Sequence, residues 1–502
     1  MAVKKILDFP GGYTTFISEL YLNAIASCFD PHTNYFSPRG KEEFQAELST
    51  EAFSFGVELD ENDKGQIVID RLVPGGPAWK SGELHKGDEL LSLQWEGKEV
   101  VDMAGASLED ADELLDESNH DRLVFKVRKA DGSTAVVLLR KEKLENEENI
   151  VKSFVLKGEK KIGYILLPGF YTEWENETGS SCANDVAKEI IKLKKENIDG
   201  LILDVRFNGG GSVGEALEMA GIFIDEGPLS AEKNKEGKQI ALKDPNRGTI
   251  YDGPLALMVN GQSASASEML AASLQDYKRA VIVGSNTYGK ATMQQMFLLD
   301  TISKKAALAA DKDMVKITVA KLYRLNGESA QFNGVAPDVT LPDAFDVLEF
   351  REKFSKQALA PDTAKRNNYY KPLQPLPVNE LAKRSAVRVN ESSEFREIKK
   401  FIETEKKMTT FTTITIPLKW DSFEKWMQQN EPQEEILKGE GTATKKFTVE
   451  NHARDKELLR NNPYAKEVNE VWLQNLSEDI YIEEAFSVLL DLINLQQPST
   501  KN

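Results

Sequence analysis

The chain has 502 residues, of which 40% are hydrophobic and 29% charged, with 63 basic against 81 acidic residues and a formal net charge of −18. This composition is typical of a globular protein with about two to four domains. The acidic balance disfavours nucleic acid or an anionic membrane surface as the main partner, because both bind clustered Lys and Arg. The sequence contains no apolar run of the roughly 18 residues that a membrane span requires, and no signal peptide is recognisable at its start.

Metal and redox chemistry are not expected. The two cysteines, Cys28 and Cys182, match no zinc or redox spacing, and the four histidines are scattered along the chain. One disulfide or two free thiols both remain open, with free thiols favoured. We therefore expect neither a bound metal nor a cofactor.

Within the first 145 residues, the sequence pattern changes near residue 50 from helical periodicity to short β-rich runs. Residues 13–49 predict a helix, a turn and a second helix. Short β-rich runs with Gly and Pro turns follow, including a strand at 66–73 and another at 89–93. Two further strands flank Asp131-Gly132, which is a strong hairpin signal. These are the strands at 122–128 and 134–140.

Residues 150–343 alternate predicted strands with predicted helices. Such alternation indicates an α/β core whose parallel strands are buried on both faces. The predicted elements are strands at 162–167, 200–206, 255–260 and 280–284, and helices at 183–195, from about 213, and at 264–276. After Pro342 the chain becomes more polar and mainly helical, with one strand at 409–418 and helices at 465–476 and 480–495.

Residues 261–268 read Gly-Gln-Ser-Ala-Ser-Ala-Ser-Glu and join a predicted strand to a predicted helix. The central serine, Ser265, is therefore expected at a strand-to-helix turn, among small neighbours that let a substrate backbone approach. Backbone N–H groups at a helix start lack intrahelical acceptors and suit an oxyanion. The alternative is an ordinary helix cap, because Ser265 and Glu268 also fit a capping box.

Lys290 is the candidate base for Ser265, since the histidines all lie far from these elements in the sequence. A lysine accepts a proton near neutral pH only if its pKa falls from about 10.4 to about 7, a shift of about 4.6 kcal/mol. Burial away from carboxylates lowers a lysine pKa in this way, and residues 289–294 include no acid. Gln294, about one helical turn further on, could hold the amine without adding charge. The alternative is an exposed loop lysine.

Residues 204–211 read Asp-Val-Arg-Phe-Asn-Gly-Gly-Gly after a predicted buried strand. Glycines at this place let backbone N–H groups approach a ligand closely. No Gly-Lys-Ser/Thr follows, so a nucleotide-binding P-loop is disfavoured. A plain tight turn is the alternative.

Together, residues 204–211, 263–268 and 287–290 resemble the motifs of the C-terminal processing, or tail-specific, serine peptidases. In that family the middle serine of Ser-Ala-Ser-Ala-Ser-Glu is the nucleophile, and the lysine base follows 25 residues later, which is the spacing of Ser265 and Lys290 here.

The resemblance also implies roles for residues around this pair. Gln294 matches the family's glutamine four residues after the lysine. The oxyanion donors it implies are the backbone N–H groups of Ala266 and of Gly210 or Gly211. Ala291 stands where the family usually has a glycine after the lysine, which removes no side chain from the site.

The resemblance covers nearly the whole chain and implies a multidomain α/β protein. Residues 30–38 and the helical C-terminal region are similar to the longer, tail-specific branch of Gram-negative bacteria. The domains expected are a helical N-terminal segment (1–50), an inserted β-rich PDZ domain (51–145), a crotonase-like α/β Ser/Lys protease core (146–343) and a mainly helical C-terminal region (344–502). That branch usually carries an export signal and more N-terminal helix, so we expect a trimmed chain and, from the family alone, a periplasmic location.

The expected substrate-recognition loop consists of Phe53, Ser54, Phe55, Gly56 and Val57. It stands where PDZ domains place their carboxylate-binding loop, whose backbone N–H groups would bind a C-terminal carboxylate. The partners expected are protein or peptide substrates with apolar C-terminal tails, together with an adaptor protein as a candidate. No nucleic acid and no integral membrane segment are expected.

The function predicted is that of a serine endopeptidase that binds protein tails through its PDZ domain and cleaves through a Ser-Lys dyad and an acyl-enzyme. One alternative is a non-catalytic PDZ scaffold, against which the joint presence of Ser265, Lys290 and Gln294 argues. Another is an acyl-CoA enzyme on a crotonase-like core, in which the PDZ segment has no purpose.

Overall fold

A computed structural model describes most of the chain and divides it into two compact units. The small unit comprises Met1–Tyr21, Phe36–Ile150 and Asn461–Val468, and the large unit comprises Leu22–Tyr35, Val151–Arg460 and Asn469–Asn502. The residues described are 12–38, 40–41, 44, 51–62, 64–116, 121–145, 149–172, 181–244, 246–299, 312–367, 369–410, 417–420, 422–423, 425, 439, 441–442 and 444–496.

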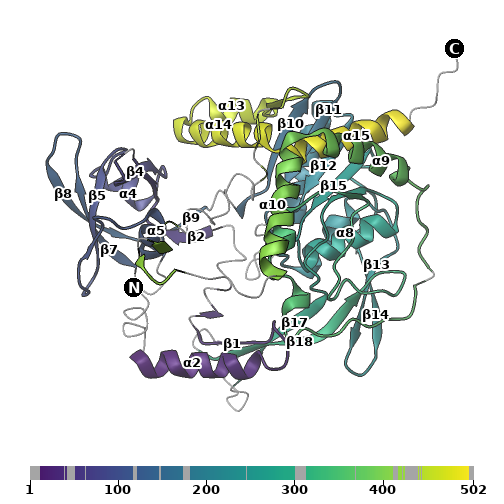
Figure 1. Cartoon of the computed structure of the whole chain (residues 1–502), viewed down its shortest axis with the longest axis horizontal. Coiled ribbons are helices and arrows are strands. Elements are labelled where there is room, and N and C mark those ends of the chain that lie inside the picture. The colour runs from purple at the N-terminus through teal and green to yellow at the C-terminus, as the bar shows by residue number, and fades with distance from the viewer. Residues whose placement is uncertain are drawn as a thin grey trace. The chain divides into compact units, whose positions relative to one another are not determined.

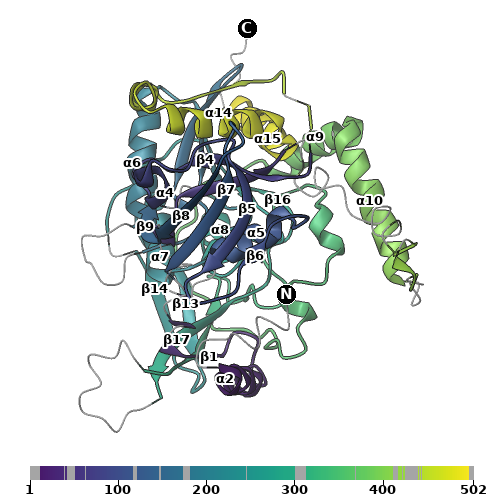
Figure 2. The same ribbon diagram turned by 90° about the vertical axis from the view of Figure 1, so that its left-hand side faces the viewer.

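An antiparallel sheet forms the body of the small unit. Its strands run in the order β3-β4-β5-β7-β8, with β6 paired to β5. Strands β4 to β8 are labelled in Figure 2. The hairpin predicted around Asp131-Gly132 is present, and Arg128 pairs with Thr134 next to its turn. The strands are β3 (Val57–Glu61), β4 (Ile67–Leu72), β5 (Glu89–Trp95), β6 (Val101–Asp102), β7 (Arg122–Arg128) and β8 (Thr134–Arg140).

Two short helices and a separate strand pair also belong to the small unit. They are α4 (Pro77–Ser81), α5 (Leu108–Asp116), and β2 (Glu51–Ser54) paired with β9 (Glu142–Glu145). Inward-facing side chains alternate along the strands, and Phe55 packs against Trp95 and Phe125 in the core. Among the residues that the structure describes, β3 ends the sheet and pairs only with β4, which leaves its outer edge open to an added strand, and α5 packs beside β3.

A seven-stranded sheet organises the large unit, in the order β19-β16-β15-β12-β11-β10-β20. The predicted strands at 162–167, 200–206, 255–260 and 280–284 form its parallel part, from β11 to β16. One end of the sheet is antiparallel, since β10 pairs in that sense with β11 and β20. The strands are β10 (Lys152–Lys157), β11 (Lys161–Leu166), β12 (Gly200–Asp204), β15 (Leu255–Val259), β16 (Val281–Gly284), β19 (Val339–Thr340) and β20 (Thr448–Glu450).

Helices cover both faces of this sheet (Figure 1). Strand β12 shows why, because Leu201 and Leu203 enter one apolar core while Ile202 enters the other. The first core is closed by α6 (Cys182–Lys195), α7 (Val213–Gly221) and α8 (Ala266–Asp276), and the second by α9 (Val378–Glu391), α10 (Ser393–Thr410) and α15 (Ile480–Gln496). The predicted α/β core with a mainly helical C-terminal region is therefore confirmed.

A second sheet of the large unit was not predicted. Its strands run in the order β1-β18-β13-β14, and β17 pairs with β18. They are β1 (Asn34–Phe36), β13 (Pro228–Asn234), β14 (Gln239–Lys243), β17 (Thr292–Leu298) and β18 (Met314–Tyr323). The helical offset expected between Lys290 and Gln294 is therefore wrong, because Gln294 lies in an extended strand.

Other predicted elements have mixed outcomes. Helix α2 (Gly12–Ala26) is present, whereas the second N-terminal helix falls mostly outside the described residues. The strand predicted at 409–418 is wrong at its first two residues, which end α10, and its central part also lies outside the described residues. The helices predicted at 465–476 and 480–495 are α14 (Pro463–Glu478) and α15, and the short helix α13 (Ala453–Leu459) precedes them. Cys28 is exposed and Cys182 buried, and both are free thiols.

Candidate active site

The predicted site residues of the large unit gather where three parallel strands end. The loop after β12 carries the glycine run, the loop after β15 leads to Ser265, and the loop after β16 leads to Lys290. Parallel strands bring their carboxyl ends to one edge of a sheet, which is where open α/β sheets bind ligands. The topology therefore joins segments that lie up to about 80 residues apart in the sequence.

Ser265 is held in an unusual backbone conformation. It precedes the first residue of α8 with φ 57° and ψ −111°, and the residue is 9% exposed. A positive φ at a non-glycine residue costs on the order of 1–3 kcal/mol and persists only where the surroundings impose it. The strain was not visible in the sequence, which predicted only a strand-to-helix turn.

The surroundings that impose it centre on one buried carboxylate, that of Glu268. Its Oε2 accepts the backbone N–H of Ser265 at 2.8 Å and that of Lys290 at 2.9 Å. Its Oε1 accepts the Thr287 hydroxyl at 2.6 Å and the Gly289 N–H at 2.7 Å. A single side chain thus fixes the backbones of the candidate nucleophile and the candidate base beside each other.

Burial raises the pKa of Glu268 to about 7, although the four donated hydrogen bonds oppose this rise. The ionised form is the one that fits the geometry, because an acceptor-only carboxylate matches four donors. The sequence suggested Glu268 only as a helix-capping residue, since its contacts with residues 287–290 depend on the tertiary fold.

The amine of Lys290 is half-buried and hydrogen-bonds to a neutral partner. Its Nζ donates to Gln294 Oε1 at 3.0 Å. Burial and, next, repulsion from Lys316 lower its pKa to about 8, against the attraction of Glu352, Glu268 and Asp30, which raises it. Such a lysine is neutral in a substantial fraction of molecules near pH 8 and can accept a proton.

Among the described residues, no hydrogen bond joins Lys290 Nζ to Ser265 Oγ, although their backbones share Glu268 Oε2. Catalytic hydrogen bonds are often long without substrate and tighten in the complex.

The glycine run lies directly against Ser265. A Cβ atom placed on Gly210 would come within 2.8 Å of Ser265 Cβ and 3.2 Å of Ala266 N, so only glycine fits there. Gly210 and Gly211 both have positive φ, 106° and 136°. The predicted oxyanion residues are therefore neighbours in space.

The backbone N–H groups of the predicted oxyanion residues differ in whether they already have a hydrogen-bond acceptor. Gly210 N–H donates to Asn208 Oδ1 at 2.9 Å and is engaged inside the loop. The N–H groups of Ala266 and Gly211 have no acceptor among the residues that the structure describes. Those two are free to donate to a substrate oxygen, whereas Gly210 would first have to leave Asn208.

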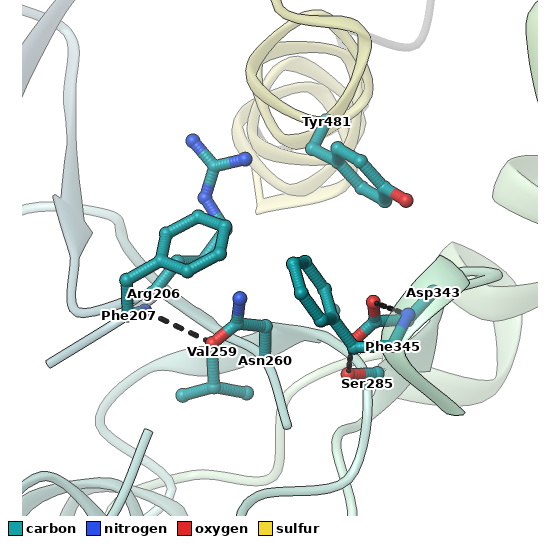
Figure 3. A pocket seen from close by; sticks show the side chains of 9 residues that line it. Arg206, Phe207, Val259, Asn260, Ser285, Asp343, Phe345 and Tyr481 are labelled. Atoms are coloured by element: carbon teal, nitrogen blue, oxygen red, sulfur yellow. Dashed lines mark hydrogen bonds between the residues drawn. The ribbon is translucent and has the colours of Figure 1, made fainter. Parts of the chain in front are cut away.

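Asn208 and Asn260 tie the glycine loop to the serine loop. Asn208 is fully buried, and its backbone carbonyl oxygen accepts hydrogen bonds from the Ala264 N–H and the Ser267 hydroxyl. Asn260 Oδ1 accepts the N–H of Phe207, which itself has φ 62°. Phe207 and Asn260 also line a small pocket, together with Arg206, Val259, Ser285, Asp343, Phe345 and Tyr481 (Figure 3). The sequence assigned no role to either asparagine.

The predicted recognition loop of the small unit is only partly open. Phe55 is 2% exposed and belongs to the core, whereas Phe53 is 63% exposed. The N–H of Gly56 donates to Ser54 Oγ at 3.0 Å, and Gly56 has a positive φ of 69°. Val57 begins the edge strand β3. Backbone recognition at β3 is therefore compatible with the fold, but the Phe55 side chain is not available to a ligand.

Four family profiles match successive parts of the chain. They are the tail-specific protease N-terminal domain (residues 14–39), the PDZ domain (44–128), peptidase family S41 (161–341) and the C-terminal domain of tail-specific proteases (345–494). The fold and these matches define a protein with a peptidase-type core and a PDZ domain. The chain belongs to peptidase family S41, in its tail-specific branch.

Two curated relatives are similar to this chain over part of their own length. A tail-specific protease of Haemophilus influenzae is 34% identical over 355 residues, which cover 70% of this chain and 50% of that protein. A probable CtpA-like serine protease of Staphylococcus haemolyticus is 28% identical, covering 62% of this chain and 57% of the relative. The chain thus spans about half the length of the curated relatives it matches.

A solved structure titled photosystem II D1 C-terminal processing protease is 26% identical, with a TM-score of 0.38, and the match covers 64% of this chain and 80% of that one.

Within the described residues, no helix combines the length and apolar character needed to cross a membrane. The same residues include no cluster of three or more His, Cys, Asp or Glu side chains arranged to hold a metal ion.

Proposed function

We propose that the chain is a serine endopeptidase in which Ser265 is the nucleophile and Lys290 the general base. The observation that carries this proposal is the state of the Lys290 amine. It is half-buried, its pKa is lowered to about 8, and its hydrogen-bond partner is the neutral amide of Gln294. An ordinary structural lysine would pair with a carboxylate and keep a high pKa.

In the first half-reaction, neutral Lys290 Nζ takes the proton of Ser265 Oγ as this oxygen attacks the substrate carbonyl carbon. The N–H groups of Ala266 and Gly211, or of Gly210 once released by Asn208, stabilise the negative oxygen, each contributing about 3 kcal/mol. The protonated lysine then gives its proton to the leaving amide nitrogen. The C–N bond breaks, and the acyl group remains on Ser265.

In the second half-reaction, Lys290 is neutral again and takes a proton from a water molecule. The resulting hydroxide attacks the acyl carbon, and the same N–H donors hold the oxyanion. The C–O bond to Ser265 breaks, Oγ recovers a proton from Lys290, and the new carboxyl terminus leaves. Gln294 keeps the amine oriented throughout, because it can hydrogen-bond to the amine without changing its charge.

We propose that the small unit selects substrates by their C-termini. The edge strand β3, with α5 beside it, suits the addition of a peptide strand, and residues 53–57, which run from the end of β2 to the first residue of β3, would receive the carboxylate. Proteins or peptides with apolar tails are the proposed substrates, and an adaptor protein remains a candidate partner. A periplasmic location is likewise proposed, from the family alone.

We also propose the domain limits 1–50, 51–145, 146–343 and 344–502. The limit at 145/146 is supported by the end of the small unit's central segment at Ile150, and the limit at 343/344 by the boundary between the peptidase and C-terminal profiles at residues 341 and 345.

Cleavage of unstructured polypeptides tests the proposal. The purified chain is incubated with polypeptides that carry an apolar C-terminus, either free or amidated, and products are identified by mass spectrometry. We expect internal cleavage of the free form and a higher KM for the amidated form. Lys290→Ala should abolish cleavage while leaving peptide binding near that of the unmodified chain.

The same experiment separates the scaffold alternative. If the unmodified chain binds the free tail but releases no product at any pH from 6 to 9, the non-catalytic scaffold is correct. Lys243→Ala, which removes an exposed lysine at the end of β14, serves as the control and should leave cleavage unchanged.

A further inference from the structure

A short N-terminal segment of the large unit reaches the candidate active site. Asp30 and Thr33 are 4% and 5% exposed, although they belong to a turn between α2 and β1. The Asp30 carboxylate accepts the His32 N–H at 2.9 Å and the Thr33 hydroxyl at 2.5 Å. Its Oδ1 also accepts the hydroxyl of Thr318, in β18, at 2.9 Å.

Thr318 connects Asp30 to the lysine through Gln294. Gln294 Nε2 donates to Thr318 Oγ1 at 3.0 Å and to Thr292 Oγ1 at 2.9 Å. Gln294 Oε1 in turn accepts from Lys290 Nζ. The hydrogen-bond chain therefore runs from the lysine amine to the Asp30 carboxylate through two side chains.

The direction of every bond in this chain follows from its acidic end. An ionised carboxylate only accepts, so the single hydroxyl proton of Thr318 must point to Asp30. Thr318 Oγ1 can then only accept from Gln294, which turns the NH₂ of the amide to Thr318 and its carbonyl oxygen to Lys290. Without Asp30, the amide could turn over and present NH₂ donors to the lysine amine, which would no longer have an acceptor.

The same turn reaches the backbone next to the lysine by a second route. His32 Nε2 contacts Glu352 Oε2 at 2.7 Å, and Glu352 Oε1 accepts Gln331 Nε2 at 2.8 Å. Gln331 Oε1 then accepts the Ala291 N–H at 2.8 Å. Residues 30–33 thus contact both the side-chain and the backbone supports of Lys290.

We propose that Asp30 is a positioning residue for Lys290, and that residues 30–33 are part of the active site although they lie about 235 residues before Ser265 in the sequence. The inference rests on the proposed function. It assigns the turn a role in the chemistry, by fixing the orientation of Gln294, in addition to any role in folding.

The pH profile distinguishes this role from a structural one. The charged groups that act on Lys290 are Lys316, which lowers its pKa, and Glu352, Glu268 and Asp30, which raise it. Asp30→Asn removes one of the raising charges, so the pKa of Lys290 falls further. The acidic limb of kcat/KM then moves to lower pH while kcat decreases, a combination that simple destabilisation does not produce.

Two variants test the link, with cleavage of the free-tail polypeptide as the readout. Asp30→Asn and Thr318→Val should each lower kcat about 10- to 100-fold, as expected for a misplaced catalytic group, with KM changed less than about twofold. Thr318→Ser keeps the hydroxyl and should restore most of the activity. Only Asp30→Asn should move the acidic limb, because Thr318→Val removes no charge.

Asp276→Asn is the matched control. Asp276 is also a largely buried carboxylate of the large unit, but it accepts from Arg324 and the Leu325 N–H, outside the route from residues 30–33 to Lys290. It should lower the melting temperature and leave kcat and the pH limb unchanged. If Asp30→Asn does not fold, the comparison of Thr318→Val with Thr318→Ser decides.

The outcomes separate the two proposals. If the unmodified chain cleaves but Thr318→Val keeps full kcat, the positioning role is wrong and the peptidase proposal stands. The positioning role is equally wrong if folded Asp30→Asn keeps full kcat and an unmoved limb. If the unmodified chain does not cleave, the peptidase proposal itself is wrong.

Discussion

The two candidate sites of this protein, the Ser265–Lys290 region and the edge strand β3, use different physical chemistry. In the large unit, side chains from remote segments converge on buried polar groups, and burial shifts the pKa values of Glu268 and Lys290. In the small unit, the proposed peptide recognition would use backbone groups at the edge strand β3, next to Gly56, which has a positive φ. The proposed chemistry of the large unit depends on the positions of single atoms, whereas the proposed peptide binding at β3 would be the sum of many weak backbone contacts.

This difference teaches where substitutions should act. A buried hydrogen-bond network loses function when one partner is removed, because the remaining groups are left unsatisfied. A strand added to an exposed edge gains from each backbone pair separately. We therefore expect changes in the large unit to act on kcat and changes in the small unit to act on KM.

The largest effect is expected from Ser265→Ala. Removing the nucleophile should lower kcat by at least about 10⁴-fold, since residual rates then depend on binding and oxyanion stabilisation alone. Tail binding, measured by fluorescence anisotropy with a labelled peptide, should stay within about twofold. Substantial remaining cleavage in Ser265→Ala would show that another group attacks the substrate.

Glu268→Gln should have the next largest effect. The amide can offer only one oxygen to the four donors that the carboxylate now accepts, and its NH₂ would face two of them. We expect kcat to fall about 10²-fold, because the backbones of Ser265 and Lys290 shift against each other. The melting temperature should also fall.

The control for Glu268 is Glu215→Gln. Glu215 is a buried carboxylate that accepts Ser181 Oγ and the Ala183 N–H at the start of α6. It should lower stability and leave kcat unchanged in the folded protein. Equal losses of kcat in both variants would mean that Glu268 acts through stability alone.

The pH dependence sharpens the comparison further. Below about pH 8 the Lys290 amine is protonated and cannot act as a base, and below about pH 7 Glu268 is protonated too. We expect kcat/KM to rise about tenfold per pH unit from 7 towards 8 and to flatten above that. Tail binding to the small unit should change far less over this range, which isothermal titration calorimetry would measure. A rate that is flat from pH 6 to 9 would contradict the neutral-lysine mechanism.

The smallest effect is expected from Gly56→Ala. Gly56 has a φ of 69°, which strains any other residue, and an added Cβ would lie 3.2 Å from Leu144 Cδ1 and 3.3 Å from Val73 Cβ, so these neighbours must give way slightly. KM should rise about three- to tenfold with kcat unchanged, as for the loss of part of a binding interaction made equally in the ground and transition states.

Gly132→Ala is the matched control for Gly56. Gly132 has a φ of 83° in the hairpin of the same unit, and an added Cβ would meet nothing within 4 Å. It should show a similar backbone strain without the change in KM. A rise in KM for both variants would show that KM follows the stability of the unit and not the geometry of the loop.

Much of the architecture could be read from local patterns. The hairpin around Asp131-Gly132 and the parallel strands β11, β12, β15 and β16 were predicted, because apolar periodicity and turn residues act over a few neighbours. The second sheet was missed, since its paired strands β17 and β18 mix polar with apolar residues and are separated by residues 299–313 instead of by a short turn that would signal a hairpin. The helical offset predicted between Lys290 and Gln294 was wrong because Gln294 lies in β17, a strand of this second sheet.

The sequence by itself determined which groups are candidates for the chemistry, since the serine, lysine and glycine motifs are continuous segments whose spacing can be compared with a family. Only the tertiary structure decided how they are held. The shared oxygen of Glu268 and the hydrogen-bond route from Asp30 to Lys290 connect residues that lie from about 20 to 290 positions apart. The positive φ of Ser265 is imposed by these surroundings. Hydrogen bonds depend on distance and direction in space, and burial sets the pKa values, so none of these features could be inferred from neighbours in the chain.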